Sequence, residues 1–316
     1  MMNALLFVAL LAPAAAASPS PSPLASATGA AATASPSATA AAASSAATAA
    51  PTVTSAATTA TAAPAATAVT TPEAGTAGST VAAPNGLEIT WHGQSCFMMR
   101  TPGKTTVLMD PVPLEIGYKP PTVKADLVTI SHEHPDHNNV KMVEVAGAAA
   151  GGAEVLRGLT KDGWAEIDES VGDVHVSTVH SFHDAEQGKK FGRNAIFIFD
   201  VAGRRVVHLG DLGQQLTPEQ LKALGTVDVL MIPIGGHYTL DAAGANQVIA
   251  AIKPRYVVLP MHYKTPALKI RELTPPEAFL ADRSGVLRVD GNSYTVPDTK
   301  GAHAPAAPTI VMLKAN

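Results

Sequence analysis

The stretch Ser131-His132-Glu133-His134-Pro135-Asp136-His137 directly follows the apolar run Leu127-Val128-Thr129-Ile130. Three histidines and two carboxylates are poorly suited to core packing, whereas neutral imidazoles and a carboxylate that converge on one point hold transition metals. A solvated loop with helix-capping residues is the plainer alternative, and a single histidine would favour it. The H-x-H-x-D-H spacing after a strand therefore predicts a metal site.

Three later apolar runs end in the same way, each before side chains that can bind a metal. The runs and the residues that follow them are 174–179 with His180, His183 and Asp184, 205–209 with Asp211, and 256–259 with His262. In layered sheet folds, ligands gather at strand ends, because loops aim the side chains while the sheet keeps them rigid. We therefore expect these strand ends to meet at one site.

The 316-residue chain divides by composition into two unlike parts. No Asp, Glu, Lys or Arg precedes Glu73, so all 22 basic and 26 acidic side chains lie in the remainder. The net charge of −4 and the lack of a basic run argue against a nucleic-acid-binding face. Cys96 is the single cysteine, which excludes an intrachain disulfide, and we expect it to be a small buried apolar residue.

The first part of the chain begins with a stretch that resembles an export signal and continues as a low-complexity segment. Residues 1–17 resemble a signal peptide, with a short apolar run and then Ala15-Ala16-Ala17, although no Lys or Arg precedes the run. That run is too short to span a bilayer, which needs about 20 apolar residues. Residues 18–83, rich in Ala, Thr, Ser and Pro, predict a disordered linker. We expect an exported protein, periplasmic or extracellular.

Residues 84–316 predict one folded domain, in which short apolar runs alternate with turn residues. The expected strands cover 87–91, 96–99, 105–109, 127–130, 174–179, 195–199, 205–209, 229–232 and 256–259. A capping box at Thr217-Pro218-Glu219-Gln220 predicts a helix to about Leu224, the alanine-rich segment 241–252 predicts a second, and 274–277 opens a third. This order predicts a layered α/β (α+β) domain with the sheet inside and helices outside.

The ordered set of H-x-H-x-D-H, His183, Gly210-Asp211 and His262 resembles the metallo-β-lactamase superfamily. The resemblance covers Leu87 to His262 and implies a four-layer αβ/βα sandwich with a two-metal site between the sheets. The surroundings are similar to the ascorbate-6-phosphate-lactonase-like branch of Zn-dependent hydrolases. The stretches that carry this narrower likeness are Ile89 to Phe97, His208 to Gly213, Ile232 to Thr239 and Pro260 to Tyr263.

The resemblance implies a ligand set that is divided between two ions. The first ion would be bound by His132, His134 and His183, the second by Asp136, His137 and His262, and Asp211 would bridge both. His180 stays an alternative to His183, although Asp184 follows His183 as in relatives. Two Zn²⁺ ions per chain are expected, with Mn²⁺ as the alternative, because His134 suits zinc whereas di-iron members usually carry Glu there.

The implied reaction is hydrolysis of a small-molecule ester, lactone or phosphodiester by a hydroxide held between the ions. Asp136 and Asp211 are the catalytic carboxylates, and His237, in a Gly-rich loop after a strand, is the candidate for substrate contact. Asp110 is expected to support a ligand histidine by a hydrogen bond. The role of His92 stays open, because it precedes Gly93-Gln94-Ser95 where relatives often have Gly-His-Ser.

Several other assignments accompany this site. His175 and His208 lie within apolar strands and are expected to be structural, while Tyr238 and Tyr263 either line the pocket or serve packing. The rival function is a non-catalytic metal-binding or ligand-sensing module displayed on a flexible stalk, although such a module has no need of a bridging carboxylate. No transmembrane span is expected, and no heptad repeat indicates an oligomeric state.

Overall fold

The computed structural model describes residues 86–143, 152–281, 283–298 and 303–315. The predicted signal peptide and linker, residues 1–83, lie outside these ranges. The strands are β1 (Leu87–Gly93), β2 (Cys96–Arg100), β3 (Thr106–Met109), β4 (Leu127–Ile130), β5 (Glu154–Arg157), β6 (Asp168–Val171), β7 (Val174–Phe182), β8 (Arg193–Val201), β9 (Arg204–His208), β10 (Val229–Pro233), β11 (Val257–Met261), β12 (Val286–Arg288), β13 (Ser293–Val296) and β14 (Thr309–Met312). The helices are α1 (Pro218–Leu224), α2 (Ala242–Ile252) and α3 (Glu277–Leu280), with the 3₁₀ turns η1 (Leu114–Ile116) and η2 (Val140–Met142).

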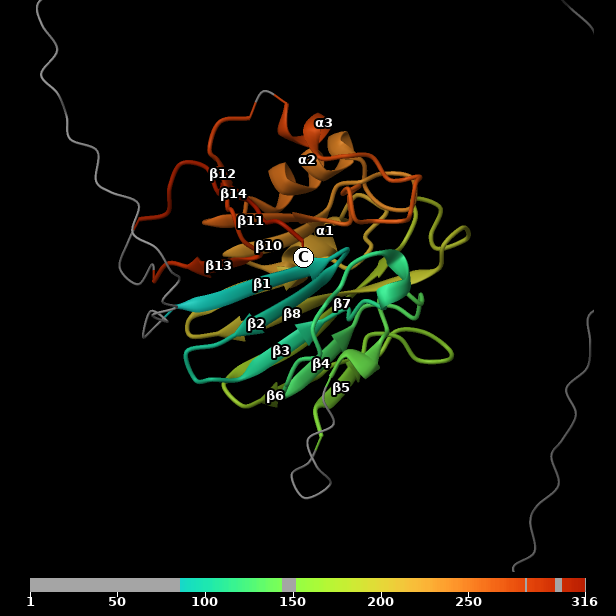
Figure 1. The fold of residues 1–316 in the computed structure, drawn as a ribbon, viewed down its shortest axis with the longest axis vertical. Helices are drawn as coiled ribbons and strands as arrows, with labels where there is room; N and C mark the ends of the chain where they lie inside the picture. The colour runs from blue at the N-terminus through green and yellow to red at the C-terminus, as the bar shows by residue number, and fades with distance from the viewer. Residues whose placement is uncertain (1–85, 144–151, 282, 299–302, 316) are drawn as a thin grey trace, which may run out of the picture. The chain divides into compact units, whose positions relative to one another are not determined.

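Two sheets pack face to face, as Figure 1 shows with β1 to β4 in front of β7 and β8. The first sheet has the order β13-β1-β2-β3-β4-β5 and the second the order β12-β14-β11-β10-β9-β8-β7-β6. One cluster of buried apolar side chains contains Trp91 and Met99 from the first sheet together with Phe197 and Phe199 from the second. Because apolar surface from both sheets is removed from water there, the core lies between the sheets.

The two outer faces are covered differently. On the second sheet, α2 buries Val248, Ile249 and Ile252 at the helical spacing that predicted it, and Asp241 caps its first turn by accepting from the Gly244 N–H. On the first sheet, the described residues contain no α-helix, and the segment 112–143 with its 3₁₀ turns packs on this face instead. No helix in the described ranges is long and apolar enough to cross a membrane.

The directions of the strands bring the chemically important ends together. Strands β9, β10 and β11 are parallel, and β7 is parallel to β9 because both are antiparallel to β8, which lies between them. The carboxyl ends of β7, β9 and β11 therefore meet at one edge of the second sheet. In the first sheet, β3 and β4 are parallel and end together as well. The loop after β4 carries the H-x-H-x-D-H stretch.

Candidate metal centre

The loop after β4 is fixed by the carboxylate of Asp110, at the end of the neighbouring β3. One Asp110 oxygen accepts from the Ser131 N–H at 2.8 Å, and the other accepts from Ser131 Oγ at 2.6 Å. The second oxygen also lies 3.0 Å from His137 Nδ1, which must donate because a carboxylate only accepts. Asp110 thus supports a histidine of the cluster as expected, and it leaves His137 Nε2 to face the site.

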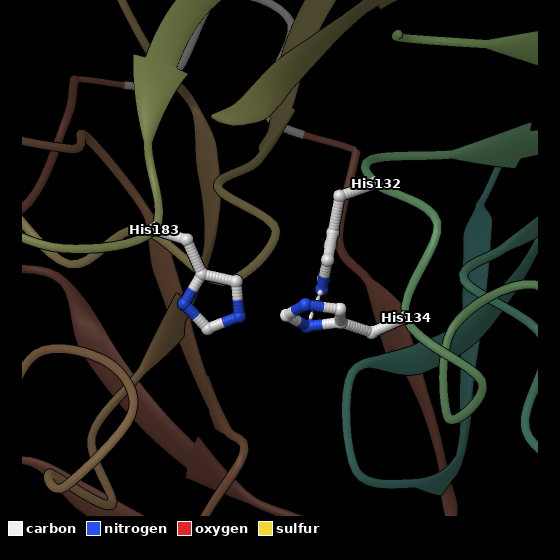
Figure 2. A group of neighbouring side chains, drawn as sticks. All are labelled: His132, His134 and His183. Atoms are coloured by element: carbon white, nitrogen blue, oxygen red, sulfur yellow. Dashed lines mark hydrogen bonds between the residues drawn. The ribbon is translucent and has the colours of Figure 1, made fainter. Parts of the chain in front are cut away.

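Three histidines from two sheets converge on one point (Figure 2). His132 Nε2 and His134 Nδ1 are 3.1 Å apart, and with a ring nitrogen of His183 they form a group whose ligand atoms all lie within 4.8 Å of one another. His183 comes from the end of β7, opposite the other two. Its Nδ1 lies 3.0 Å from the backbone oxygen of Tyr238 and donates to it, so Nε2 is left to bind a metal.

A second group of ligand atoms lies beside the first and consists of Asp136, His137 and His262. His137 Nε2 is 3.5 Å from Asp136 Oδ2. His262 enters from the end of β11 with its backbone N–H donating to the Gln94 oxygen at 3.1 Å. Asp110, His132 and His137 form a further group whose possible ligand atoms also lie within 4.8 Å of one another. Its Asp110 oxygens already accept hydrogen bonds from Ser131 and His137, so this carboxylate acts as a support.

Asp211 lies between the two groups. Its Oδ2 atom is 3.0 Å from His262 Nε2 and 3.2 Å from His137 Nε2. The same oxygen is 3.2 Å from His183 Nε2 and 3.9 Å from His132 Nε2. One carboxylate oxygen thus contacts ring nitrogens of both groups, which is the position a bridging ligand requires. We call the seven residues of the two groups and this bridge the ligand cluster; they are His132, His134, Asp136, His137, His183, Asp211 and His262.

The backbone around Asp211 explains why glycine precedes it. Gly210 has φ of +55°, and a Cβ atom there would lie 2.3 Å from Asn194 Oδ1 and 2.7 Å from the Ser131 Cβ. Asn194, buried on β8, accepts from the Asp211 N–H at 2.9 Å and donates to the Leu209 oxygen. The Asn194 side chain therefore binds the backbone of the turn after β9 at both Leu209 and Asp211, which fixes the position of the Asp211 carboxylate.

The turn between β1 and β2 supplies two supports that sequence reasoning did not identify. Gln94 Nε2 donates to Asp136 Oδ2 at 3.0 Å, and Ser95 Oγ donates to Asp211 Oδ1 at 3.1 Å. Gln94 is fully buried with φ of +50°, a conformation uncommon for residues other than glycine. The sequence signal for this contact was Gln94 itself, which stands in Gly93-Gln94-Ser95 where relatives often have His. This replacing residue contacts Asp136 of the ligand cluster.

The pKa values of neighbouring groups in the cluster are displaced in opposite directions. Burial holds the pKa of His132 well below its ordinary value, and His137 lowers it further. Burial also lowers the pKa of His137, but Asp211 and Asp136 outweigh it and hold that pKa well above the ordinary value. The pKa of Asp211 is held well below its ordinary value, against burial, by His137 and His262. A cation is therefore favoured at this buried carboxylate.

Of the two rival histidines on β7, the structure brings His183 to the cluster and His180 away from it. His180 is half-exposed, pairs with Glu166 at 2.8 Å and stacks on Trp164 with ring centroids 4.9 Å apart. Because successive side chains of a strand point to opposite faces, residues three apart lie on opposite faces, and β7 also ends between these two histidines. His183 lies beyond its last residue, Phe182, and turns into the site.

Other histidines have distinct surroundings. His208 is buried, with Nε2 donating to the Ser95 oxygen at 2.8 Å, which fits its expected structural role. His175 is half-exposed on β7 and pairs with Asp168 at 3.0 Å, so its side chain lies outside the core. His92 is buried, and neither of its ring nitrogens has a hydrogen-bond partner within the described part of the chain. Burial lowers the pKa of His92 to about 4.

A cavity of about 680 Å³ opens onto the ligand cluster. Tyr238 contributes to its lining, whereas the neighbouring His237 is exposed, has φ of +57° and packs its ring against Tyr238 at 4.3 Å. The assignment of His237 to substrate contact stays a prediction, and the lining of this cavity does not support it. Tyr263 is buried against Trp91 with ring centroids 5.3 Å apart, which is packing. Cys96 is buried, as expected.

Known proteins match the chain over the region that carries the cluster. A family model for a beta-lactamase superfamily domain matches residues 88–262. A UPF0173 metal-dependent hydrolase of Thermoplasma acidophilum is 33% identical over 192 residues, covering 57% of this chain and 84% of that protein. A UPF0173 metal-dependent hydrolase of Archaeoglobus fulgidus is 32% identical over 201 residues, with the same two coverages of 57% and 84%.

A solved structure gives the same fold. It comes from Thermotoga maritima and is described as a Zn-dependent hydrolase of the metallo-β-lactamase superfamily. The two structures compare with a TM-score of 0.54 and 31% sequence identity, and the match covers 73% of this chain and 100% of that chain. Fold and site together define the class of metal-dependent hydrolases with a metallo-β-lactamase sandwich. This chain belongs to the beta-lactamase superfamily, within its UPF0173 family of metal-dependent hydrolases. The predicted fold class is thereby confirmed.

Proposed function

We propose that the protein hydrolyses a small-molecule ester, lactone or phosphodiester with water activated between two divalent ions. The observation that carries this proposal is the position of Asp211, whose Oδ2 lies 3.0 to 3.9 Å from ring nitrogens of both ligand groups. A single-metal site needs no carboxylate shared between two histidine groups. Paired ions that share such a ligand are typical of two-metal hydrolases.

The residues fit the proposed ions on two counts. Among the residues that the structure describes, buried His137 Nε2 has no hydrogen-bond partner, although buried polar atoms in proteins nearly always have one, and a metal would satisfy it. The donor set consists of imidazole nitrogens and carboxylate oxygens without a thiolate, which suits Zn²⁺. Mn²⁺ is the alternative. The first ion would be held by His132, His134 and His183, and the second by Asp136, His137 and His262.

The chemistry follows from the ions and from the residues around them. Bound there, the ions would lower the pKa of a water between them to about 7 and polarise the substrate oxygen. Asp136 Oδ2 accepts a hydrogen bond from Gln94 Nε2 and lies 3.5 Å from His137 Nε2. The carboxylate is therefore fixed well enough to orient that water or accept its proton. Ser95 and Asn194 hold Asp211, so the bridging position is fixed before substrate binds.

Two finer statements belong to this proposal. Similarity of the stretches around Gly93, Gly210 and Gly235 favours the ascorbate-6-phosphate-lactonase-like branch, and the sequence before Glu73 favours export to the periplasm or the outside. The rival function, a metal-binding or ligand-sensing module without catalysis, would keep the ligands but show no turnover.

A substrate panel tests the proposal. Purified full-length protein, loaded with Zn²⁺ or Mn²⁺, is assayed against chromogenic lactones, esters, phosphodiesters and β-lactams beside metal-free protein. We expect metal-dependent turnover of at least one class. Absence of turnover across the panel, in protein shown to hold its metal, would contradict the proposal and favour the binding module.

A further inference from the structure

The cavity above the ligand cluster has the size and character of a pocket for an apolar small molecule. Its volume of about 680 Å³ lies within the range of about 300 to 1,000 Å³ that is usual for such ligands. At its base are His134, Asp136, His183, Asp211 and His262 of the cluster. Its apolar lining residues are Pro113, Ile116, Pro135, Phe191, Tyr238 and Ile270.

One wall is formed by Phe191 and Tyr238. The ring of Phe191 lies 5.5 Å from that of His183 and 5.4 Å from that of Tyr238, measured between centroids. The backbone N–H of Phe191 donates to Asp184 at 2.8 Å, and Asp184 also accepts from the N–H groups of Glu186, Gly188 and Lys190. These four bonds fix the segment that carries Phe191 beside a ligand of the cluster.

A second part of the lining joins two segments that are far apart in sequence. The Lys269 N–H donates to the Ile116 oxygen at 2.8 Å, which ties η1 to the segment after β11. Lys264 Nζ donates to the backbone oxygens of Leu268 and Ile270, on either side of Lys269. The ammonium group of Lys264 therefore stabilises the backbone of this part of the lining. Ile116 and Ile270 line the cavity.

The charges outside the ligand cluster do not favour an anionic substrate. Outside the cluster, the described lining residues include two anions, Glu115 and Glu272, and one cation, Lys269, which leaves a net charge of −1. None of the described lining residues is an arginine, the side chain that binds phosphate by paired hydrogen bonds. An uncharged substrate avoids the repulsion that a phosphodiester would meet at these walls.

We propose that this cavity selects uncharged carboxylic esters or lactones with an apolar portion over phosphodiesters, with Phe191, Ile116 and Ile270 contacting that portion. The proposal rests on the hydrolytic function proposed above. In the reaction, water supplies the oxygen that joins the acyl carbon, the acyl carbon–oxygen bond breaks, and the alcohol oxygen leaves with a proton. No oxidant, reductant or further co-reactant is required.

The first test compares substrates on the metal-loaded full chain. Butyrate has two more methylenes than acetate, and each buried methylene is worth about fourfold, so kcat/KM for 4-nitrophenyl butyrate should exceed that for the acetate by about 15-fold. Both esters should exceed bis(4-nitrophenyl) phosphate, each rate being divided by its rate in metal-free buffer. A phosphodiester preference would overturn this inference and leave the proposed hydrolase intact, whereas no turnover of any substrate would overturn the proposed function.

A matched pair of variants tests the wall. Leu114 and Ile116 belong to the same 3₁₀ turn, but Leu114 is 62% exposed and outside the lining, whereas Ile116 lines the cavity. Ile116→Ala should reduce the butyrate-to-acetate ratio by about fourfold or more, and Leu114→Ala should leave it unchanged. Equal ratios in both variants and the parent would contradict the proposal.

A binding measurement tests the same wall without catalysis. The neutral fluorescent probe N-phenyl-1-naphthylamine should bind the folded protein, with binding weakened several-fold in Phe191→Ala and unchanged in Leu114→Ala. Ethyl hexanoate should displace the probe from metal-free protein at a lower concentration than dibutyl phosphate does. Stronger displacement by dibutyl phosphate would overturn the proposal whatever the activity assays give.

Discussion

The floor and the walls of the cavity are built from different kinds of residues. The floor is the ligand cluster, which lies at strand ends of both sheets and is supported by buried polar contacts such as Asp110 with His137 and Asn194 with Asp211. The walls are apolar side chains on loops, with exposed charges at Glu115 and Glu272. The floor is thus suited to one kind of chemistry, and the walls can change without disturbing it.

This difference predicts two kinds of mutational effect. Changes in the floor should reduce the rate for every substrate, because in the proposed mechanism the same ions and water would serve all of them. Changes in the walls should alter the ratio between substrates by a few-fold and leave metal content unchanged. The following variants, in order of decreasing effect on the rate, either sharpen this distinction or break it.

Asp211→Ala should have the largest effect. Removing the oxygen that contacts both histidine groups should lower metal content and reduce kcat/KM by about 10³-fold or more for all substrates, since the ions would lose their shared ligand. Metal analysis and steady-state kinetics measure both quantities, with circular dichroism as the control for folding. A variant that kept its metal and its rate would refute the bridging assignment.

His183→Ala and His180→Ala form a matched pair from the same end of β7. His183→Ala should reduce kcat/KM by about 10²-fold or more and weaken binding of one ion, because a direct ligand is lost. His180→Ala should stay within about twofold of the parent, because its half-exposed ring pairs with Glu166 outside the site. Comparable losses in the two variants would mean that the third ligand is wrongly assigned.

Gln94→Leu should reduce metal affinity or kcat by about 10-fold to 100-fold, because it removes the hydrogen bond to Asp136 while retaining most of the side-chain volume. Metal titration followed by kinetics at saturating metal separates the two effects. The exposed Gln187→Leu is the control variant. If Gln94→Leu matched this control, Asp136 would be held adequately without the amide.

His92→Phe should leave the rate unchanged and alter only the pH dependence of stability. With a folded pKa of about 4 against 6.5, the unfolded chain binds more protons between these values, so stability falls as pH falls. For His92 this loss is about 2 kcal/mol between pH 7 and pH 4.5. Urea unfolding of metal-free parent and variant at both pH values measures it, and an unchanged pH dependence would argue that His92 is protonated in the fold.

The sequence predicted the strands that are apolar and central but not those at the edges. Strands β5 and β6 have largely exposed residues such as Glu154, Asp168 and Glu169, and a charged edge strand carries little periodic signal. Strands β12 and β13 were also missed, since they are mostly half-buried or exposed and give no continuous apolar run, unlike the equally short β3 and β4. Strand β14 was missed as well, although it contains the apolar run Ile310-Val311-Met312. The expected boundaries of the other strands differ from those observed by at most three residues, and those of β4 agree at both ends.

The candidate ligands were readable because the H-x-H-x-D-H stretch is contiguous and the other candidates each follow an apolar run, and the structure brings their side chains together. The supports were harder to predict, since Gln94, Ser95 and Asn194 reach their partners through contacts between distant parts of the chain. Of the wall residues, only Tyr238 was anticipated, as one of two tyrosines that either line the pocket or serve packing. Phe191 lines the cavity through a turn organised by the Asp184 carboxylate, and nothing in its local sequence indicates that contact.

The most direct test of the two-ion account is the number of metal ions bound by each chain. The purified full-length protein is dialysed against Zn²⁺ and then against metal-free buffer. Inductively coupled plasma mass spectrometry then gives the metal-to-protein ratio. The account predicts a ratio close to two for the parent and a clear fall in Asp211→Ala. A ratio of one in fully active parent protein would contradict it.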